Sequence, residues 1–185
     1  MKDIKGLMYC AIFVALIAVG AFIKIPIPVV PFTLQLLFTM LAGLLLGGKL
    51  GGLAVSIYVL MGLIGFPVFT QGGGFTYIFN PSFGYLIGFI IGAYITGTIA
   101  NQEKNPGIKR LLLANFVGLF IVYFFGMIHC YVINVFYLGN VMSLWTLFLY
   151  CFILAVPGDI ILCILGAVLG KRLISVMNTR LTFAK

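Results

Sequence analysis

One acidic side chain, Asp159, lies within a long apolar part of this chain, where an acid can do chemistry that its neighbours cannot. Placing an acid near the centre of a membrane helix costs about 2.5 to 3.5 kcal/mol, so such a residue usually serves a purpose. The preceding Pro157 and Gly158 free backbone carbonyls and break a helix beside the carboxylate. An acid satisfied by neighbouring helices, or kept protonated by desolvation, remains an alternative. We favour a functional role for Asp159.

Two further polar side chains stand at a similar depth. At ~1.5 Å per residue of helix, Asp159 is ~18 Å from Lys171 and Gln35 is ~21 Å from Lys49. Tyr85 follows at the start of a later apolar run. All three side chains are therefore expected in the half of the molecule that lies away from these two lysines.

Two connecting segments are expected at the same end as these polar groups. Lys24 stands beside "IPIPVVP" (25–31), whose prolines favour an extended and rather stiff connection. Asn80 lies near the end of a second segment, "FTQGGGFTYIFNPSFGY" (69–85). These positions together predict a polar pocket that opens at this end and is covered by two loops.

The second segment is unusual because three consecutive glycines, Gly72, Gly73 and Gly74, interrupt an otherwise apolar sequence. Glycine adopts positive φ without steric penalty and lets the backbone approach a neighbour closely. We therefore predict that this loop is a lid and part of the wall of a binding site. A simple turn between two spans is the alternative, but a turn needs only a few residues.

Composition decides which elements must position these residues. The chain is 63% hydrophobic and 8% charged, with a mean hydropathy of +1.26, which is typical of an integral membrane protein. A membrane helix needs ~20 apolar residues. Dividing the charge-free stretches at the glycine loop and at "YLGNVMS" (137–143) predicts an all-α, six-transmembrane-helix bundle forming one domain, 1–185, with spans at about 6–24, 32–48, 50–67, 83–101, 109–136 and 143–170.

The basic residues predict the orientation of this bundle. An even number of spans places both termini on one side, and that side receives every assigned basic residue except Lys24: Lys2, Lys5, Lys49, Lys104, Lys109, Arg110, Lys171, Arg172, Arg180 and Lys185. The positive-inside rule predicts cytoplasmic termini, so the polar pocket faces outward. The net charge of +8 is spread over short cytoplasmic edges, which argues against a nucleic-acid partner.

Several other functions are not supported by the residue pattern. The four cysteines, Cys10, Cys130, Cys151 and Cys163, lack metal-ligand or C-x-x-C spacing, so we expect no metal and no cofactor. No nucleophile–base pair or paired carboxylate suggests catalysis, and no nucleotide-binding motif is present. A cleaved signal peptide is a weaker alternative to retention of the first span.

The first span carries a small-residue pattern. Ala11 and Ala15 form a small-xxx-small pair that Ala18 extends, which permits close approach of another helix. That helix can belong to the same bundle or to a partner protein.

Several motifs together resemble those of the BioY family, the biotin-binding S-components of energy-coupling factor (ECF) transporters. The segments that carry the resemblance are "PVVPFTLQ" (28–35), "GGKLGG" (47–52), "YVLMGLIGFPVF" (58–69), "GGG" (72–74), "PSFGYLIGF" (81–89) and "PGD" (157–159). Two positions depart from the family pattern: Asn80 replaces a glycine, which suggests a side-chain role there, and Leu162 replaces a lysine, which leaves the partner of Asp159 open.

The resemblance implies a substrate-capturing protein of a prokaryotic cell membrane. It would take biotin from outside and work with a transmembrane T-component and a pair of cytoplasmic ATPases. The small-residue face of Ala11, Ala15 and Ala18 would contact the T-component. A solitary secondary transporter of biotin or a related vitamin is the alternative function.

Biotin would make distinct demands on the pocket. Asp159 would accept from the ureido N–H groups, and Asn80 or Gln35 would donate to the ureido carbonyl. Aromatic side chains would hold the apolar body, with Tyr85, Phe75 and Tyr150 as candidates. The biotin carboxylate would bind the N–H groups of the glycine loop or the hydroxyl of Tyr77 or Tyr85, with Lys24 as a further candidate.

Overall fold

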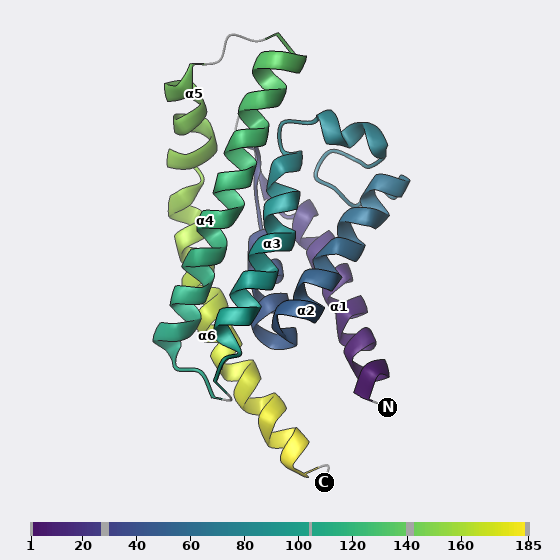
Figure 1. Ribbon diagram of the computed structural model, residues 1–185, viewed down its shortest axis with the longest axis vertical. Helices are drawn as coiled ribbons and strands as arrows, with labels where there is room; N and C mark the ends of the chain where they lie inside the picture. The colour runs from purple at the N-terminus through teal and green to yellow at the C-terminus, as the bar shows by residue number, and fades with distance from the viewer. Residues whose placement is uncertain (1, 27–29, 104, 140–142, 184–185) are drawn as a thin grey trace.

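The computed structural model describes residues 2–26, 30–103, 105–139 and 143–183, and most of them are helical. Among the described residues, five helical stretches are long and apolar enough to cross a membrane: Ile4–Phe22, Gln35–Ile64, Phe83–Ala100, Ile108–Tyr137 and Trp145–Val176. The N- and C-termini lie at the same end of the bundle (Figure 1). An all-α membrane protein is thereby confirmed, whereas the structure contains five such stretches where six spans were predicted.

The difference in number arises in α2 (Gln35–Ile64), which contains the second and third predicted spans. Gly47 has non-helical backbone angles, with φ 83° and ψ 170°. The Gln35 side chain reaches the hydroxyl of Tyr58 at 2.8 Å, although a straight helix would separate these residues by ~35 Å. The helix is thus folded back on itself near Gly47, as the reversal of its ribbon in Figure 1 also shows. This bend lies two residues before Lys49, where the sequence placed the boundary.

The loops at the end away from the termini contain short ordered elements. Strands β1 (Lys24–Ile25) and β2 (Phe32–Thr33) pair antiparallel, with Lys24 opposite Thr33. The two strands contain the described ends of the predicted extended connection at 25–31, of which residues 27–29 lie outside the described residues. The glycine loop leads into a 3₁₀ helix, η1 (Phe75–Phe79).

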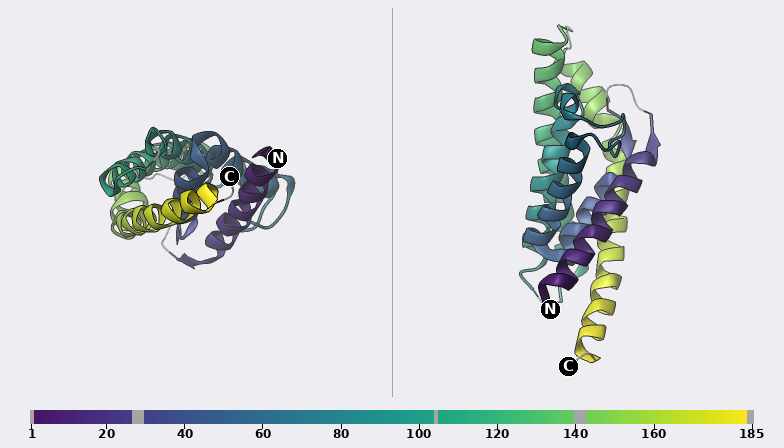
Figure 2. Two further views of the ribbon diagram at one scale, coloured as in Figure 1. Left: turned by 90° about the horizontal axis from the view of Figure 1, so that it is seen from below. Right: turned by 90° about the vertical axis from the view of Figure 1, so that its right-hand side faces the viewer.

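Helix α3 (Phe83–Ala100) lies between α2 and α4 (Ile108–Val132), and small residues bring the three backbones together. A Cβ on Gly43 would come within 2.5 Å of the Ala93 carbonyl, and one on Gly88 within 2.7 Å of the Val122 Cα. Helix α1 (Lys2–Phe22) packs mainly on α2 and lies at the periphery of the bundle (Figure 2). One face of α1 is consequently left open.

The last predicted span is not one uniform helix. It consists of α5 (Leu144–Phe148), a π-helical turn η3 (Leu149–Ile153) and α6 (Val156–Phe183). Helix α4 also ends in a π-helical turn, η2 (Ile133–Tyr137). The interruption before Val156 confirms the break predicted beside Pro157 and Gly158, because α6 begins there and carries Asp159 in its first turn.

Candidate binding site

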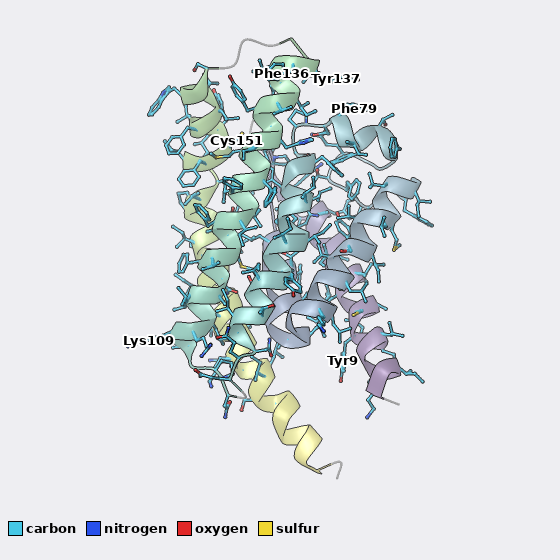
Figure 3. All side chains as sticks on the ribbon, in the orientation of Figure 1. Tyr9, Phe79, Lys109, Phe136, Tyr137 and Cys151 are labelled. Carbon is cyan, nitrogen blue, oxygen red and sulfur yellow. The ribbon has the colours of Figure 1, made fainter. Side chains whose placement is uncertain are left out.

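A cavity lies in the half of the bundle away from the termini. Figure 3 shows Cys151, one of its lining residues, at the opposite end from Lys109 and Tyr9. The space between the lining atoms, counted together with the open mouth, is about 640 Å³. The β-hairpin, the glycine-loop region and helices α2, α3, α4, η3 and α6 all contribute to its wall. Loops therefore cover a pocket whose base is formed by helices, as the sequence predicted.

Asp159 is buried and lines this cavity. Tyr123 of α4 donates a hydrogen bond to Asp159 Oδ2, while Oδ1 makes no hydrogen bond to any described residue. The first turn of a helix also stabilises a carboxylate, because the helix dipole is positive there. The next-door Gly158 has no room for a side chain, since a Cβ would lie 2.6 Å from the Phe32 ring of the hairpin. This packing fixes the carboxylate against the cavity and leaves one oxygen available.

Gln35 also lines the cavity and is 3% exposed. Its Nε2 donates to the Tyr58 hydroxyl at 2.8 Å, and its Oε1 accepts from Thr33 Oγ1 at 3.3 Å. A side-chain amide has two N–H donors and two acceptor lone pairs. Gln35 is therefore held by its neighbours and still has one donor and one acceptor position for a ligand.

Three of the predicted tyrosines, Tyr77, Tyr85 and Tyr150, line the same cavity. The Tyr77 hydroxyl lies 3.0 Å from Thr70 Oγ1 and 3.2 Å from Ser82 Oγ, so three hydroxyl groups gather at this wall. Tyr85 instead donates to the Cys151 carbonyl at 3.2 Å, which uses its hydroxyl proton within the protein. The cavity thus combines apolar and aromatic walls with polar side chains, namely Asp159, Gln35 and the three neighbouring hydroxyl groups of Thr70, Tyr77 and Ser82.

The three loop glycines do not line the cavity. Gly72 and Gly74 have φ of 109° and 111°, which confirms the predicted positive φ at these two positions. Gly73 approaches the end of α2 so closely that a Cβ would lie 2.2 Å from the Phe66 carbonyl oxygen. The glycines shape the loop, and flanking residues of the loop provide the wall of the cavity. Phe75 is 70% exposed and is not part of that wall, so the structure does not support its expected contact.

Asn80 and Lys24 are also absent from the lining and have structural partners. Asn80 Oδ1 accepts from the backbone N–H of Ser82 at 3.0 Å and from its hydroxyl at 2.8 Å, and Nδ2 donates to Gln71 at 2.7 Å. Lys24 Nζ donates to the Thr70 carbonyl at 2.7 Å and joins the hairpin to the glycine loop. Both side chains hold cavity-lining residues in place, which agrees with a side-chain role for Asn80 but not with direct contact.

The sequence pattern did not single out four polar residues that line the cavity, or the residue that holds Gln35. The four are Tyr123, Thr33, Thr70 and Ser82, and the fifth is Tyr58. Tyr123 lies in the run "FIVYFFG", where an aromatic residue is as well explained by lipid contact. Its helical spacing from the polar Asn115 was a usable signal, because both lie on the buried face of α4. Asn115 Nδ2 donates to the Cys163 carbonyl at 2.8 Å and so joins α4 to α6.

All four cysteines are free and buried.

A second hollow, an apolar groove that we call the alanine groove, lies between α1 and the second half of α2. Ala11, Ala15 and Ala18 line it, and the first two are exposed. Ala11 and Ala15 are therefore not closely packed against another described part of this chain. Helix α1, which forms one wall of this groove, lies at the periphery of the bundle (Figure 2).

A bundle of apolar helices around one partly polar cavity defines a multi-pass membrane protein with a site for a small solute, and the described residues include no cluster that could hold a metal. Comparison with known proteins specifies this class. The family model "BioY family" matches residues 1–179, and the chain belongs to the BioY family. Members of this family are transporter S-components, so the chain is a transport protein and not an enzyme.

Individual relatives support this membership over nearly the whole chain. A "Probable biotin transporter BioY" of Lysinibacillus sphaericus is 46% identical over 94% of this chain and 89% of its own length. The "Biotin transporter BioY" of Thermotoga maritima is 39% identical over 91% and 95%, respectively. The crystal structure of an S-component for biotin from an ECF-type ABC transporter superimposes with a TM-score of 0.81, at 31% identity over 93% and 92% of the two chains.

Proposed function

We propose that this protein captures biotin from the extracellular side and delivers it for ATP-driven uptake by an ECF transporter. The observation that carries the proposal is the buried Asp159 carboxylate, which lines the cavity and is held there by a hydrogen bond from Tyr123 to Oδ2. The printed functions of its relatives support biotin as the solute. No cofactor is part of the proposal, since biotin is the transported ligand.

In the proposed complex, Asp159 accepts from the ureido N–H groups and Gln35 donates to the ureido carbonyl. Both side chains have unused hydrogen-bonding positions that fit these roles. Tyr85, Tyr123 and Tyr150 provide aromatic walls for the rings and chain of biotin.

The biotin carboxylate is then left to the hydroxyl groups of Thr70, Tyr77 and Ser82. This choice follows from the cavity lining, which includes these three residues and excludes Lys24 and the loop glycines. Hydroxyl groups can reorient to donate to a carboxylate without moving the backbone.

We further propose six spans, with both halves of α2 crossing the membrane and the termini in the cytoplasm of a prokaryotic cell. The folding back of α2 at Gly47 supports two antiparallel crossings. The proposed cytoplasmic side carries the excess of basic residues, which agrees with the positive-inside rule. These residues include Lys5, Lys49, Lys109 and Arg110.

The partner of the alanine groove is proposed to be the T-component, which a pair of cytoplasmic ATPases would drive. Exposed Ala11 and Ala15 beside an open groove allow a second helix to approach closely. No nucleotide-binding motif occurs in this chain, so the energy for uptake would come from these partners.

Uptake measurements distinguish this function from solitary secondary transport. Cells that lack their own biotin transporter receive this chain alone, with the T-component and ATPases, or with ATPases that cannot hydrolyse ATP. Accumulation of labelled biotin is expected only with the complete active module. Equal uptake by the chain alone would support the secondary-transporter alternative.

A further inference from the structure

The binding cavity and the alanine groove share a wall. Tyr58 and Met61 of α2 and Val68 of the following loop line the groove on the side opposite α1. The two residues after Val68 in this loop, Phe69 and Thr70, line the cavity. Consecutive residues of one short segment thus belong to two separate hollows. A displacement of this segment in response to a ligand would change both.

Tyr58 connects the two hollows by hydrogen bonds. Its hydroxyl accepts from Nε2 of the cavity residue Gln35 at 2.8 Å and donates to the Val68 carbonyl at 2.9 Å. Its ring packs edge-on against Phe69, with the ring centroids 5.6 Å apart. Tyr58 is fully buried, its hydrogen bond with Gln35 is buried as well, and its hydrogen bond to the Val68 carbonyl is partly buried.

The loop has little freedom to move independently of this chain of contacts. The Phe69 ring covers Gly62, where a Cβ would lie only 2.0 Å from the ring. The Gly74 N–H is bonded to the Gly62 carbonyl at 2.7 Å, which attaches the other side of the loop to the same helix. Gln35, Tyr58 and Val68 therefore form one continuous set of contacts between the cavity and the groove.

We propose that Tyr58 is a positioning residue that couples occupation of the binding cavity to the shape of the α1–α2 groove. A ligand that hydrogen-bonds to Gln35 reorients the amide, and Tyr58 carries this change to Val68. The groove would then present a different surface to a partner helix when the cavity is occupied. The proposal rests on the proposed function, because it takes biotin as the ligand.

The test reports on the groove directly. Ala15→Cys is labelled with a trifluoromethyl thiol reagent in the full-length purified protein, and ¹⁹F spectra are recorded with and without saturating biotin. The unsubstituted chain, treated identically, reveals any labelling of the buried native cysteines. We expect biotin to shift the ¹⁹F resonance, and we expect Tyr58→Phe to abolish the shift while the ring still fills its place.

Matched variants separate coupling from general loosening of the site. Lys24→Met also removes a hydrogen bond to the same loop, at the Thr70 carbonyl, but Lys24 lines neither the groove nor the cavity, so the shift at saturating biotin should persist. Gln35→Met removes the hydrogen bond to Tyr58 from the cavity side and should also abolish the shift at saturating biotin. This variant tests the coupling if Tyr58→Phe does not fold.

The outcomes distinguish this proposal from the proposed function. Calorimetry on the same preparations records biotin binding independently of the label. Biotin binding without any shift in the Ala15→Cys protein, or a full shift in Tyr58→Phe, would overturn the coupling and leave biotin capture intact. A complete lack of biotin binding in the unsubstituted chain would overturn both.

Discussion

At the scale of single residues, Asp159 must offset the cost of its own burial. That cost is about 2.5 to 3.5 kcal/mol near the centre of a membrane helix. A hydrogen bond to a charged group contributes about 1.5 to 3 kcal/mol, and a favourable helix-terminus position contributes up to ~2 kcal/mol. Tyr123 and the first turn of α6 provide these two contributions. The carboxylate can thus be held in the cavity while Oδ1 stays available.

Replacing this carboxylate with an amide tests its role as an acceptor. Asp159→Asn keeps the size of the side chain but presents a donor to the ureido N–H groups. Loss of one charge-assisted hydrogen bond costs about 1.5 to 3 kcal/mol, so biotin affinity should fall by roughly 10- to 100-fold in calorimetric titration. Glu103→Gln, at an exposed acid of the loop between α3 and α4, is the matched control and should retain full affinity. An unchanged affinity in folded Asp159→Asn would return Asp159 to a purely structural role.

Charge and rarity made some site residues predictable and others not. Asp159 and Gln35 were predictable because a polar group in an apolar run is costly and conspicuous. Tyr123 and Tyr58 were not, because an aromatic residue in such a run fits a lipid-facing position equally well. Asn80 and Lys24 were placed at the correct end, but their hydrogen bonds to Ser82, Gln71 and Thr70 depend on loop geometry that a sequence pattern does not specify.

At the scale of elements, the glycine loop positions the cavity wall without contributing its glycines to it. Positive φ at Gly72 and Gly74 turns the chain, and Gly73 lies against the backbone at the end of α2. These contacts direct Phe69, Thr70 and Tyr77 toward the cavity. The loop therefore contributes to the cavity wall through its flanking side chains, and we propose that it acts as a lid in this way.

A methyl group at Gly73 should disturb this lid. Gly73→Ala places a Cβ 2.2 Å from the Phe66 carbonyl oxygen, and the backbone must move to relieve the clash. Such overpacking typically costs 1 to 3 kcal/mol, so the Tm should fall and biotin affinity should drop by about tenfold. Gly107→Ala, where a Cβ meets nothing within 4 Å, is the control that should change neither quantity. Undiminished biotin affinity in Gly73→Ala would show that the loop does not shape the site.

Hydropathy located the apolar elements well, because membrane helices require long apolar runs. It also placed the division of α2 within two residues of the bend at Gly47. The β-hairpin at Lys24–Thr33 and the π-helical turns η2 and η3 were not foreseen. Their backbone hydrogen bonds depend on neighbouring elements. No local sequence pattern distinguishes the hairpin from a loop, or the π-helical turns from regular helix.

At the scale of the whole molecule, the proposed binding site and the proposed docking surface have different principal elements. The cavity is enclosed by elements from the hairpin to α6, whereas the alanine groove lies between α1 and α2 at the periphery. A substitution on the groove side of α1 can therefore affect association with a partner without touching the bound solute.

Bulky substitutions on α1 should separate the two activities. Ala15→Trp fills the groove, so co-purification with the T-component and ATP-driven uptake should fall sharply. Biotin affinity of the solubilised protein should change much less than association with the partner, because Ala15 does not line the cavity and acts on it only through the groove. Ile12→Trp, at an exposed position of the same helix outside the groove, should preserve both activities. Lost biotin binding with retained partner association would show that this helix face is assigned incorrectly.

We propose that the isolated chain recognises biotin in its own cavity. Calorimetric titration of the purified, detergent-solubilised protein with biotin tests it most directly, without partner proteins or ATP and with thiamine and riboflavin as comparison ligands. We predict saturable binding of biotin at one site per chain and no binding of the other two vitamins. Tight binding of thiamine or riboflavin, with none of biotin, would contradict the account.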